Sequence, residues 1–484
     1  MNFNSFRYLL FLPCAAGLYW LAPKKLRNYL LLALSYGFYM CWQPRFALLL
    51  LYVTLLSYGA GRLLGAFPRR KKLWLTLALL LGLLPLFFYK YYAFFCGLLE
   101  ALLGDVGLRI ALPRLALLLP VGISFFTFQA LSYVIDVFRG KQEVERSLPV
   151  YALFVAFFPQ ISAGPIGRAP QLLPQLRSPH RLSWDDFTEG VLLLLWGLFK
   201  KVLIADQLAV LVNTAYNAPW SFSGWQLMVA TAAFSIQIYC DFSGYSDMAI
   251  GSARFFGIRL MRNFDAPYLS QSVKEFWRRW HISLSFWFRD YLYFPLGGSR
   301  KGYWRTLLNV MIVFAVSGLW HGAAMTFVLW GSLNGLFQVL SVLTEKPRAA
   351  VRRLLRVRED GLPIAVFRVC CTFALISLAW VFFKASSFAT GLFIVKRMAL
   401  ALIGQPHGVF DLAALGLGRS RLLLLALCMP LLLVTSLRRE PIKARLAASL
   451  PLRTAVFFLL AASVLLFGSY GSGYNPQDFV YFKF

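Results

Sequence analysis

The amino-acid sequence predicts an all-α protein that crosses a membrane many times. Of its 484 residues, 59% are hydrophobic and only 14% are charged, and the mean hydropathy is +0.64, which excludes an ordinary soluble enzyme. Apolar runs of about 17 to 25 residues recur along the chain, a length that lets a helix cross the hydrocarbon core. Phe, Trp and Tyr make up 17% of the residues, and many lie near the ends of these runs, as in interfacial aromatic belts.

The net charge of +29 arises from basic clusters in short loops between the apolar runs. Such clusters stay on the cytoplasmic side of a bilayer, so we expect membrane lipids as neighbours and no nucleic-acid partner. Basic residues follow the first and third runs, at 24–27 and 69–72, which predicts an N-terminus outside the cytoplasm. The first five spans are expected at residues 6–22, 28–42, 46–67, 73–99 and 110–138.

The segment 151–168 contains Pro159 and Gly164 and does not fit a plain spanning helix. Irregular backbone at membrane depth needs protein or water around it. The pattern therefore predicts a re-entrant piece near residues 151–165 that borders an internal cavity, and a kinked connector without a ligand is the alternative. The polar stretch 170–189 is expected on the cytoplasmic face.

Two further spans, at 190–213 and 222–240, and a second re-entrant piece near 241–255 are expected next. Asp241 and Asp247 lie at the start of this piece. At their spacing the two carboxylates would point to nearly opposite sides of a helix, which argues against a paired acid/base site. We expect Asp241 to cap a helix or, together with Ser243, to line an internal tunnel.

Residues 254–305 form a basic belt, with ten Lys and Arg residues against three acidic residues. Within this belt, the Pro-free, helix-compatible residues 275–285 carry His281 and predict one interfacial helix. A purely structural role is the alternative for this histidine. The arginines expected to bind the phosphates of an acyl donor are Arg278, Arg279 and Arg289. Membrane orientation and contact with anionic lipid headgroups are the alternative roles of these arginines.

His321 lies inside the continuous apolar run 307–342. This run is too long for one spanning helix, so Gly318 and Gly322 predict a break or a hairpin at the histidine. An ionisable side chain at membrane depth is costly and therefore predicts function. A buried neutral imidazole can take a proton from a hydroxyl that attacks an acyl donor, while Trp320 lines the tunnel beside the acyl group. A structural histidine and a proton relay in a transporter are the alternatives.

The rest of the chain adds spans but little chemistry. Later spans are expected at 363–383, 420–436 and 452–470, which gives about eleven in total and an outside C-terminus, while the run 390–403 is left unassigned. His180 and His407 stand beside prolines in polar loops and are expected to be solvated. The seven cysteines have no metal-ligand spacing, so no metal site is expected. No internal repeat is evident, which counts against a secondary transporter.

Several motifs together resemble the membrane-bound O-acyltransferase family. They are EFWRRWHISLS at 275–285, FRDYLYFPLGG at 288–298, GLWHGA at 318–323 and LWG at 329–331, supported by 158–164, 239–246 and 479–484. The most similar branch is that of bacterial alginate O-acetylation membrane proteins. The resemblance implies one integral membrane domain over 1–484, with a core at 120–345 and C-terminal helices at 360–484, in which a ring of helices and re-entrant helices surrounds a central tunnel.

The resemblance also implies the chemistry. His321 matches the invariant histidine of the family and His281 a second functional histidine. In that branch an acetyl group passes from a cytoplasmic donor through a bacterial inner membrane to an extracytoplasmic acetyltransferase partner of the SGNH type, which modifies a polysaccharide. The donor implied is acetyl coenzyme A, or another acyl thioester, used as a substrate, and no bound cofactor is implied. Peptidoglycan acetylation, D-alanyl transfer to teichoic acid and polysaccharide or lipid export without acyl chemistry remain as alternatives.

Overall fold

A computed structural model describes residues 1–108, 110–115, 117–354, 361–405 and 408–468. Over these residues the chain is helical and has no β-strand, which confirms the predicted fold class. The chain divides into two compact units, with residues 1–194 and 245–261 in the first and residues 195–244 and 262–484 in the second. Two of the three boundaries fall inside helices α10 (Trp184–Leu198) and α12 (Gly224–Arg254), and the third lies in the loop between α12 and η5 (Pro267–Leu269). The single domain expected from the sequence stays a prediction.

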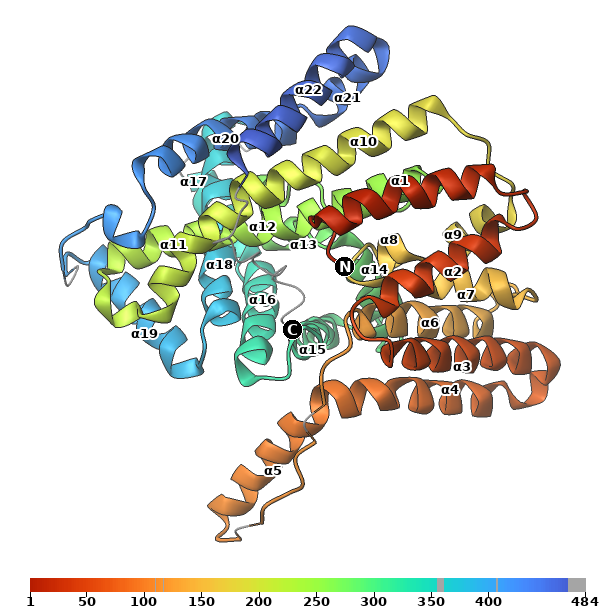
Figure 1. Cartoon of the computed structure of the whole chain (residues 1–484). Helices are drawn as coiled ribbons and strands as arrows, with labels where there is room; N and C mark the ends of the chain where they lie inside the picture. The colour runs from red at the N-terminus through yellow and green to blue at the C-terminus, as the bar shows by residue number, and fades with distance from the viewer. Residues whose placement is uncertain (109, 116, 355–360, 406–407, 469–484) are drawn as a thin grey trace. The chain divides into compact units, whose positions relative to one another are not determined.

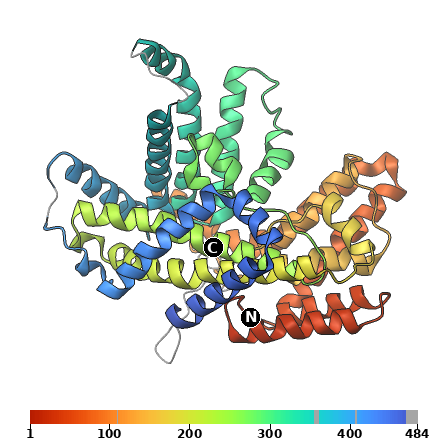
Figure 2. The ribbon, with the colours of Figure 1, turned by 90° about the horizontal axis from the view of Figure 1, so that it is seen from above.

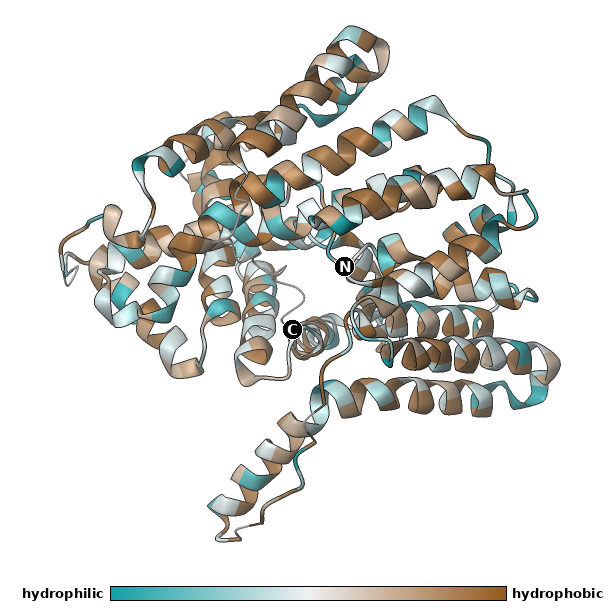
Figure 3. Ribbon diagram, viewed as in Figure 1, coloured by the Kyte–Doolittle hydropathy of each residue, from teal (hydrophilic) through white to brown (hydrophobic). Residues whose placement is uncertain are grey.

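The first unit is built from short and medium helices. Its elements are α1 (Phe6–Leu21), α2 (Arg27–Met40), α3 (Phe46–Ala66), η1 (Pro68–Arg70), α4 (Lys71–Leu86), η2 (Phe87–Tyr91), α5 (Tyr92–Asp105), α6 (Ile123–Phe138), α7 (Leu148–Ala156), α8 (Phe158–Ile161) and α9 (Ala169–Arg177). Helices α3, α4 and α6 lie side by side (Figure 1). Apolar residues run along α3 and α4, and hydrophilic residues gather at the connection between them (Figure 3), as expected of two membrane spans.

The predicted span 110–138 is helical only from Ile123 onward. The prediction of a helix over its first half is therefore wrong. The described residues between 110 and 122 are not helical, because Pro113 and Pro120 lack the backbone N–H that a helix needs. Gly122 has a φ of +76° at the start of α6. A Cβ there would lie 2.2 Å from the backbone oxygen of Ile161, so the close approach requires glycine.

The two predicted re-entrant pieces have different outcomes. The first is broken as expected, because α7 ends before Phe157 and α8 is a single buried turn, while its depth in a membrane stays a prediction. The second is wrong, because α12 (Gly224–Arg254) is a continuous helix of 31 residues. Its glycines do not break the helix but let α12 pack closely against α10. A Cβ on Gly251 would lie 2.6 Å from the backbone oxygen of Gly190.

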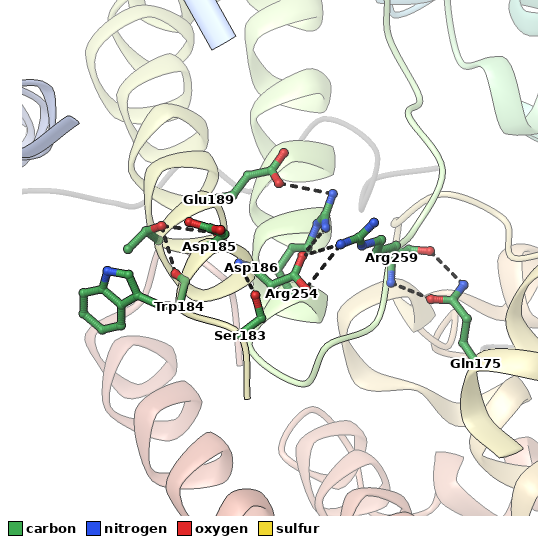
Figure 4. A network of polar contacts seen from close by, with 9 residues as sticks. Gln175, Ser183, Trp184, Asp185, Asp186, Glu189, Arg254 and Arg259 are labelled. Atoms are coloured by element: carbon green, nitrogen blue, oxygen red, sulfur yellow. Dashed lines mark hydrogen bonds and ion pairs between the residues drawn. The ribbon is translucent and has the colours of Figure 1, made fainter. Parts of the chain in front are cut away.

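A polar network ties the end of α12 to the start of α10 within the first unit (Figure 4). Asp186, in the first turn of α10, pairs with Arg254 and, at 3.2 Å, with Arg259. The backbone of Arg259 is held by the amide of Gln175, which accepts from its N–H at 2.8 Å and donates to its carbonyl at 3.1 Å. The negative charge of Asp186 is also stabilised by the positive end of the α10 helix dipole.

The second unit contains five of the seven described helices that are long and apolar enough to cross a membrane. Its elements are η3 (Phe199–Ala205), α11 (Asp206–Asn217), η4 (Pro219–Ser221), η5 (Pro267–Leu269), α13 (Val273–Arg279), α14 (Ile282–Phe288), η6 (Arg289–Tyr293), α15 (Tyr303–His321), α16 (Met325–Leu343), α17 (Glu345–Leu354), α18 (Leu362–Lys384), α19 (Phe388–Leu402), η7 (Ala413–Leu415), α20 (Arg419–Leu437), α21 (Arg439–Ala448) and α22 (Leu450–Phe467), together with the end of α10 (Trp184–Leu198). Helices α15 and α16 pack against each other as a hairpin (Figure 2), and α16 also packs against α18.

Seven helices of the described chain are long and apolar enough to cross a membrane. They confirm a protein with several membrane spans. The total of about eleven spans, the ring around a tunnel and the outside position of both termini stay predictions, and residues 469–484 lie outside the described residues. The run 390–403, which the sequence left unassigned, forms most of α19.

Candidate functional site

His321 is the last residue of α15, at the turn of the predicted hairpin. The hairpin is confirmed, because the chain becomes extended at Gly322 and α16 starts three residues later, at Met325. A Cβ on Gly322 would lie 2.2 Å from the ring of Phe327, so only glycine fits this turn. The His321 side chain is buried, with 2% exposure.

Aromatic rings surround His321. The ring centroid of Trp330 lies 4.9 Å from that of the imidazole, Trp320 lies at 4.8 Å and Phe383 at 5.7 Å, all with steep interplanar angles. These rings come from α15, α16 and α18, so the packing of three helices positions the histidine. The three rings thus surround the imidazole with apolar surface.

His281 is also buried, with 1% exposure, but not in the predicted single helix. That prediction is wrong: the chain forms two short helices, α13 and α14, and His281 sits between them with φ +44° and ψ +55°. A left-handed backbone is uncommon for a residue with a side chain, costs about 1–3 kcal/mol and tends to occur at functional sites. Hydrogen bonds hold it, since Ile282 N–H donates to the Asn263 carbonyl at 2.9 Å and Asp265 N–H donates to the Arg279 carbonyl at 2.9 Å.

Burial lowers the pKa of His281 from 6.5 to about 3. The cause is desolvation, which penalises the charged imidazolium. The ring is therefore neutral at physiological pH and can accept a proton or a hydrogen bond through one nitrogen. Its Nδ1 atom lies 3.2 Å from Oδ1 of Asn263.

The two predicted histidines contact the same indole. The ring centroid of Trp320 lies 6.1 Å from that of His281 and 4.8 Å from that of His321. Phe242 of α12 closes the other side of His281, with centroids 4.7 Å apart. Residues forty positions apart in the sequence are thus assembled around Trp320, which the sequence had assigned to a tunnel wall. That tunnel assignment stays a prediction.

Asp241 and Ser243 belong to a buried ion cluster. Its members are Lys200, Lys201, Asp206, Asp241 and Ser243, all at most 5% exposed. Lys201 Nζ lies 2.7 Å from Asp241 Oδ1 and 2.9 Å from Asp206 Oδ1, and Lys200 Nζ donates to Ser243 Oγ at 2.8 Å. Asp241 is in the middle of α12, so the expected helix cap is wrong. A carboxylate that binds a buried ammonium is instead a charge-assisted partner.

Lys200 and Lys201 were not among the residues predicted from the sequence, although the sequence carries a signal for them. Both lie inside the predicted span 190–213, and ionisable residues within an apolar span mark functional or structural polar sites. Helix α12 links the cluster to His281. The ring of Phe242 packs against the His281 imidazole, and Phe242 stands between Asp241 and Ser243 in this helix. Asn263 was not predicted either, because no local sequence pattern marks it.

The three arginines assigned to an acyl donor lie on or beside the two short helices. Arg279 pairs with Glu275 at 2.6 Å and Arg289 pairs with Asp290 at 2.8 Å, while Arg278 is exposed and makes no ion pair with any described residue. Two of the three charges are therefore partly neutralised. Binding of donor phosphates by this set stays a prediction.

The remaining histidines are outside this constellation. His180 is half-buried in the first unit, and its Nε2 atom lies 2.8 Å from the Gln175 carbonyl oxygen, so it is less solvated than expected. His407 lies outside the described residues. Within the described ranges, no group of three or more His, Cys, Asp or Glu side chains is arranged to hold a metal ion.

A sequence model of the membrane-bound O-acyltransferase family matches residues 122–383, more than half of the chain. The chain belongs to this family. It is therefore an O-acyltransferase and a multi-pass membrane protein, and the matched range includes both histidines and the buried ion cluster.

Comparison with individual proteins gives the same family. The chain is 41% identical over 394 residues to a probable alginate O-acetylase from Azotobacter vinelandii, covering 80% of this chain and 76% of that protein. It is 35% identical over 392 residues to a peptidoglycan O-acetyltransferase from Helicobacter pylori, covering 75% of this chain and 72% of that protein. A teichoic acid D-alanyltransferase from Bacillus subtilis is 28% identical over 241 residues, which cover 47% of this chain and 60% of that protein.

Proposed function

We propose that this O-acyltransferase moves an acetyl group from a cytoplasmic donor, acetyl coenzyme A, across a bacterial inner membrane for O-acetylation of an extracytoplasmic polysaccharide. Two kinds of observation support the proposal. Relatives whose alignments cover three quarters or more of this chain are named for acetylation of alginate or peptidoglycan. The observation that carries the chemistry is the buried pair His281 and His321, which contact one indole.

In this mechanism His321 is the general base. Its imidazole takes the proton of the acceptor hydroxyl while the hydroxyl oxygen attacks the thioester carbonyl, and a tetrahedral intermediate forms. The C–S bond then breaks, and the departing thiolate recovers the proton from the imidazolium. The products are an acetyl ester and a thiol, so protons and electrons balance without a metal or a redox partner.

The aromatic surround suits this chemistry. Trp320, Trp330 and Phe383 leave little room for water around His321, which protects the thioester from hydrolysis. His281 orients the donor or shares the proton, and Arg278, Arg279 and Arg289 attract the donor phosphates.

An extracytoplasmic partner completes the proposed pathway. We expect an acetyltransferase of the SGNH type to receive the acetyl group and to pass it to the polymer. The acceptor is an alginate-like exopolymer, peptidoglycan or another polysaccharide. The D-alanyl alternative has weaker support, because the teichoic acid relative covers less than half of this chain.

The test uses purified full-length protein with acetyl coenzyme A labelled in the acetyl group. We expect release of free coenzyme A and transfer of label when a hydroxyl acceptor is supplied, and neither with a His321→Gln variant. Transfer from a D-alanyl thioester but not from acetyl coenzyme A would favour the teichoic acid alternative. Polymer export by vesicles without any thioester cleavage would overturn the proposal in favour of an exporter.

A further inference from the structure

Asn263 lies on the loop between α12 and η5 and is completely buried, with 0% exposure. Its side-chain oxygen is surrounded by donors. Oδ1 lies 3.2 Å from Ser283 N, 2.9 Å from Ser283 Oγ and 3.2 Å from His281 Nδ1. The amide of Asn263 therefore contacts the start of α14 and the imidazole of His281 with one atom.

These contacts determine which way the amide faces. A backbone N–H can only donate, so the atom nearest to Ser283 N must be the oxygen of Asn263. The same oxygen cannot donate to His281, so Nδ1 of that ring carries the proton and Nε2 is the unprotonated nitrogen of the neutral ring. The Nδ2 group of Asn263 then points away from all three donors.

Nδ2 of Asn263 is buried and has no hydrogen-bond partner among the described residues. An amide nitrogen carries two N–H donors, and a buried donor left without an acceptor costs about 1–3 kcal/mol. Two other buried asparagines of the same unit use this nitrogen: Asn334 Nδ2 donates to the Trp330 carbonyl at 2.8 Å and Asn309 Nδ2 donates to the Gly298 carbonyl at 2.9 Å. A donor held beside His281 and left unused by the described residues is suited to an acceptor on a substrate.

We propose that Asn263 is a catalytic residue whose Nδ2 group donates a hydrogen bond to the carbonyl oxygen of the acyl thioester as that oxygen becomes negative. The inference rests on the proposed acyl transfer. When the acceptor oxygen bonds to the carbonyl carbon, the π electron pair moves onto the carbonyl oxygen, and Nδ2–H stabilises this charge without giving up its proton. When the C–S bond breaks, the pair returns to form the ester carbonyl. Because Oδ1 is held by three donors, Nδ2 needs no reorganisation in the transition state.

A purely structural role would hold the loop to α14 through Oδ1 alone. The variant Asn263→Asp separates the two roles, because a carboxylate keeps an oxygen for Ser283 and His281 but has no N–H. Asn263→Ser also removes the donor, without adding charge, and serves if the aspartate variant does not fold. Asn334→Asp is the matched control: it places a carboxylate at a buried position whose lost donor served only a helix carbonyl.

The experiment measures acetyl transfer from acetyl coenzyme A by equal amounts of folded, purified protein. Loss of one oxyanion donor costs about 10²–10³-fold in kcat, so we expect a loss of that order for both Asn263 variants. The KM for the donor should stay within about threefold, because the contact strengthens only in the transition state. A thioether analogue of acetyl coenzyme A, which lacks the carbonyl, should bind wild-type and variant protein equally. Asn334→Asp should keep kcat per folded molecule.

Two results would overturn the inference. One is a kcat of either Asn263 variant within about threefold of the parent. The other is full recovery of Asn263→Asp at alkaline pH, because the new carboxylate would then act only by protonating His281. If wild-type protein cleaves no acetyl coenzyme A, the proposed donor is wrong, and the same comparison is made with the D-alanyl thioester that the alternative function would use.

Discussion

The imidazole of His321 meets the indole of Trp330 edge-on, with ring centroids 4.9 Å apart and ring planes at 88°. Trp330 in turn stacks on Trp380, with centroids 5.2 Å apart and planes at 20°. The histidine at the tip of the α15–α16 hairpin therefore packs against α16, and α18 supports it through Trp380 and, directly, through Phe383. Because its position depends on packed rings, conservative changes at the histidine itself should leave the fold intact.

The first prediction concerns His321. His321→Ala and His321→Gln should insert, purify and elute like the parent but lose polymer acetylation by about 10²–10⁴-fold, the usual contribution of a positioned base. His281→Ala should be less severe. The measurement is acetyl transfer per folded molecule. Retention of more than about a tenth of the parental rate by His321→Ala would exclude a general base at this position.

A second prediction concerns the arginines. The triple variant Arg278→Gln, Arg279→Gln and Arg289→Gln should raise the apparent KM for acetyl coenzyme A more than it lowers kcat, because phosphate contacts bind ground and transition states alike. Arg278→Gln should account for most of the change, since the other two arginines already pair with Glu275 and Asp290. An unchanged KM in the triple variant would assign all three to lipids and topology.

Local sequence patterns predicted the hairpin at His321 because two glycines and an overlong apolar run are local signals. They also marked His281, since a histidine among Trp and Arg residues stands out in a polytopic chain. They could not place the break between α13 and α14, because the left-handed His281 backbone is held by Asn263 and Asp265, which are distant in sequence. Only tertiary structure brings these residues together.

The error at α12 has a related cause. A re-entrant piece was expected at residues 241–255, a range that contains Gly244 and Gly251. Each glycine instead allows the backbone of α12 to approach the backbone of α10, where a Cβ would lie 2.8 Å from the Gly197 oxygen or 2.6 Å from the Gly190 oxygen. A helix partner that is not visible in the local pattern decides what a glycine does.

The buried ion cluster yields a third prediction. Lys201→Met should lower the free energy of unfolding by about 3–5 kcal/mol, because Asp206 and Asp241 would face each other in the interior without the ammonium between them. Asp241→Asn should cost less, since the contact between Lys201 and Asp206 remains. The double variant should cost less than the sum of the two changes. Thermal unfolding in detergent measures this, and additive losses would show that the two side chains are not coupled.

Glycines at the α15–α16 contact yield a fourth prediction. A Cβ on Gly331 would lie 2.2 Å from the Phe314 backbone oxygen, so Gly331→Ala must push the two helices apart and should destabilise the protein by about 1–3 kcal/mol. Gly37→Ala in α2 is the matched control, because a Cβ there meets nothing within 4 Å. The control should leave the thermal midpoint unchanged or slightly raised. Equal midpoints for both variants would contradict the close packing at the hairpin.

The pH dependence of stability tests the environment of His281. Burial lowers its pKa from 6.5 to about 3, so below pH 6.5 the unfolded chain takes up a proton at this ring that the folded chain refuses. The contribution of this ring to stability is therefore fully present above the unfolded pKa and is lost as the pH falls toward the folded pKa. At about pH 5 the loss amounts to about 2 kcal/mol. His281→Gln has no such group, so its stability should decline less between about pH 7 and about pH 5. Thermal midpoints of both proteins across this range measure the difference; parallel curves would mean that His281 is protonated as easily in the folded protein as in the unfolded chain.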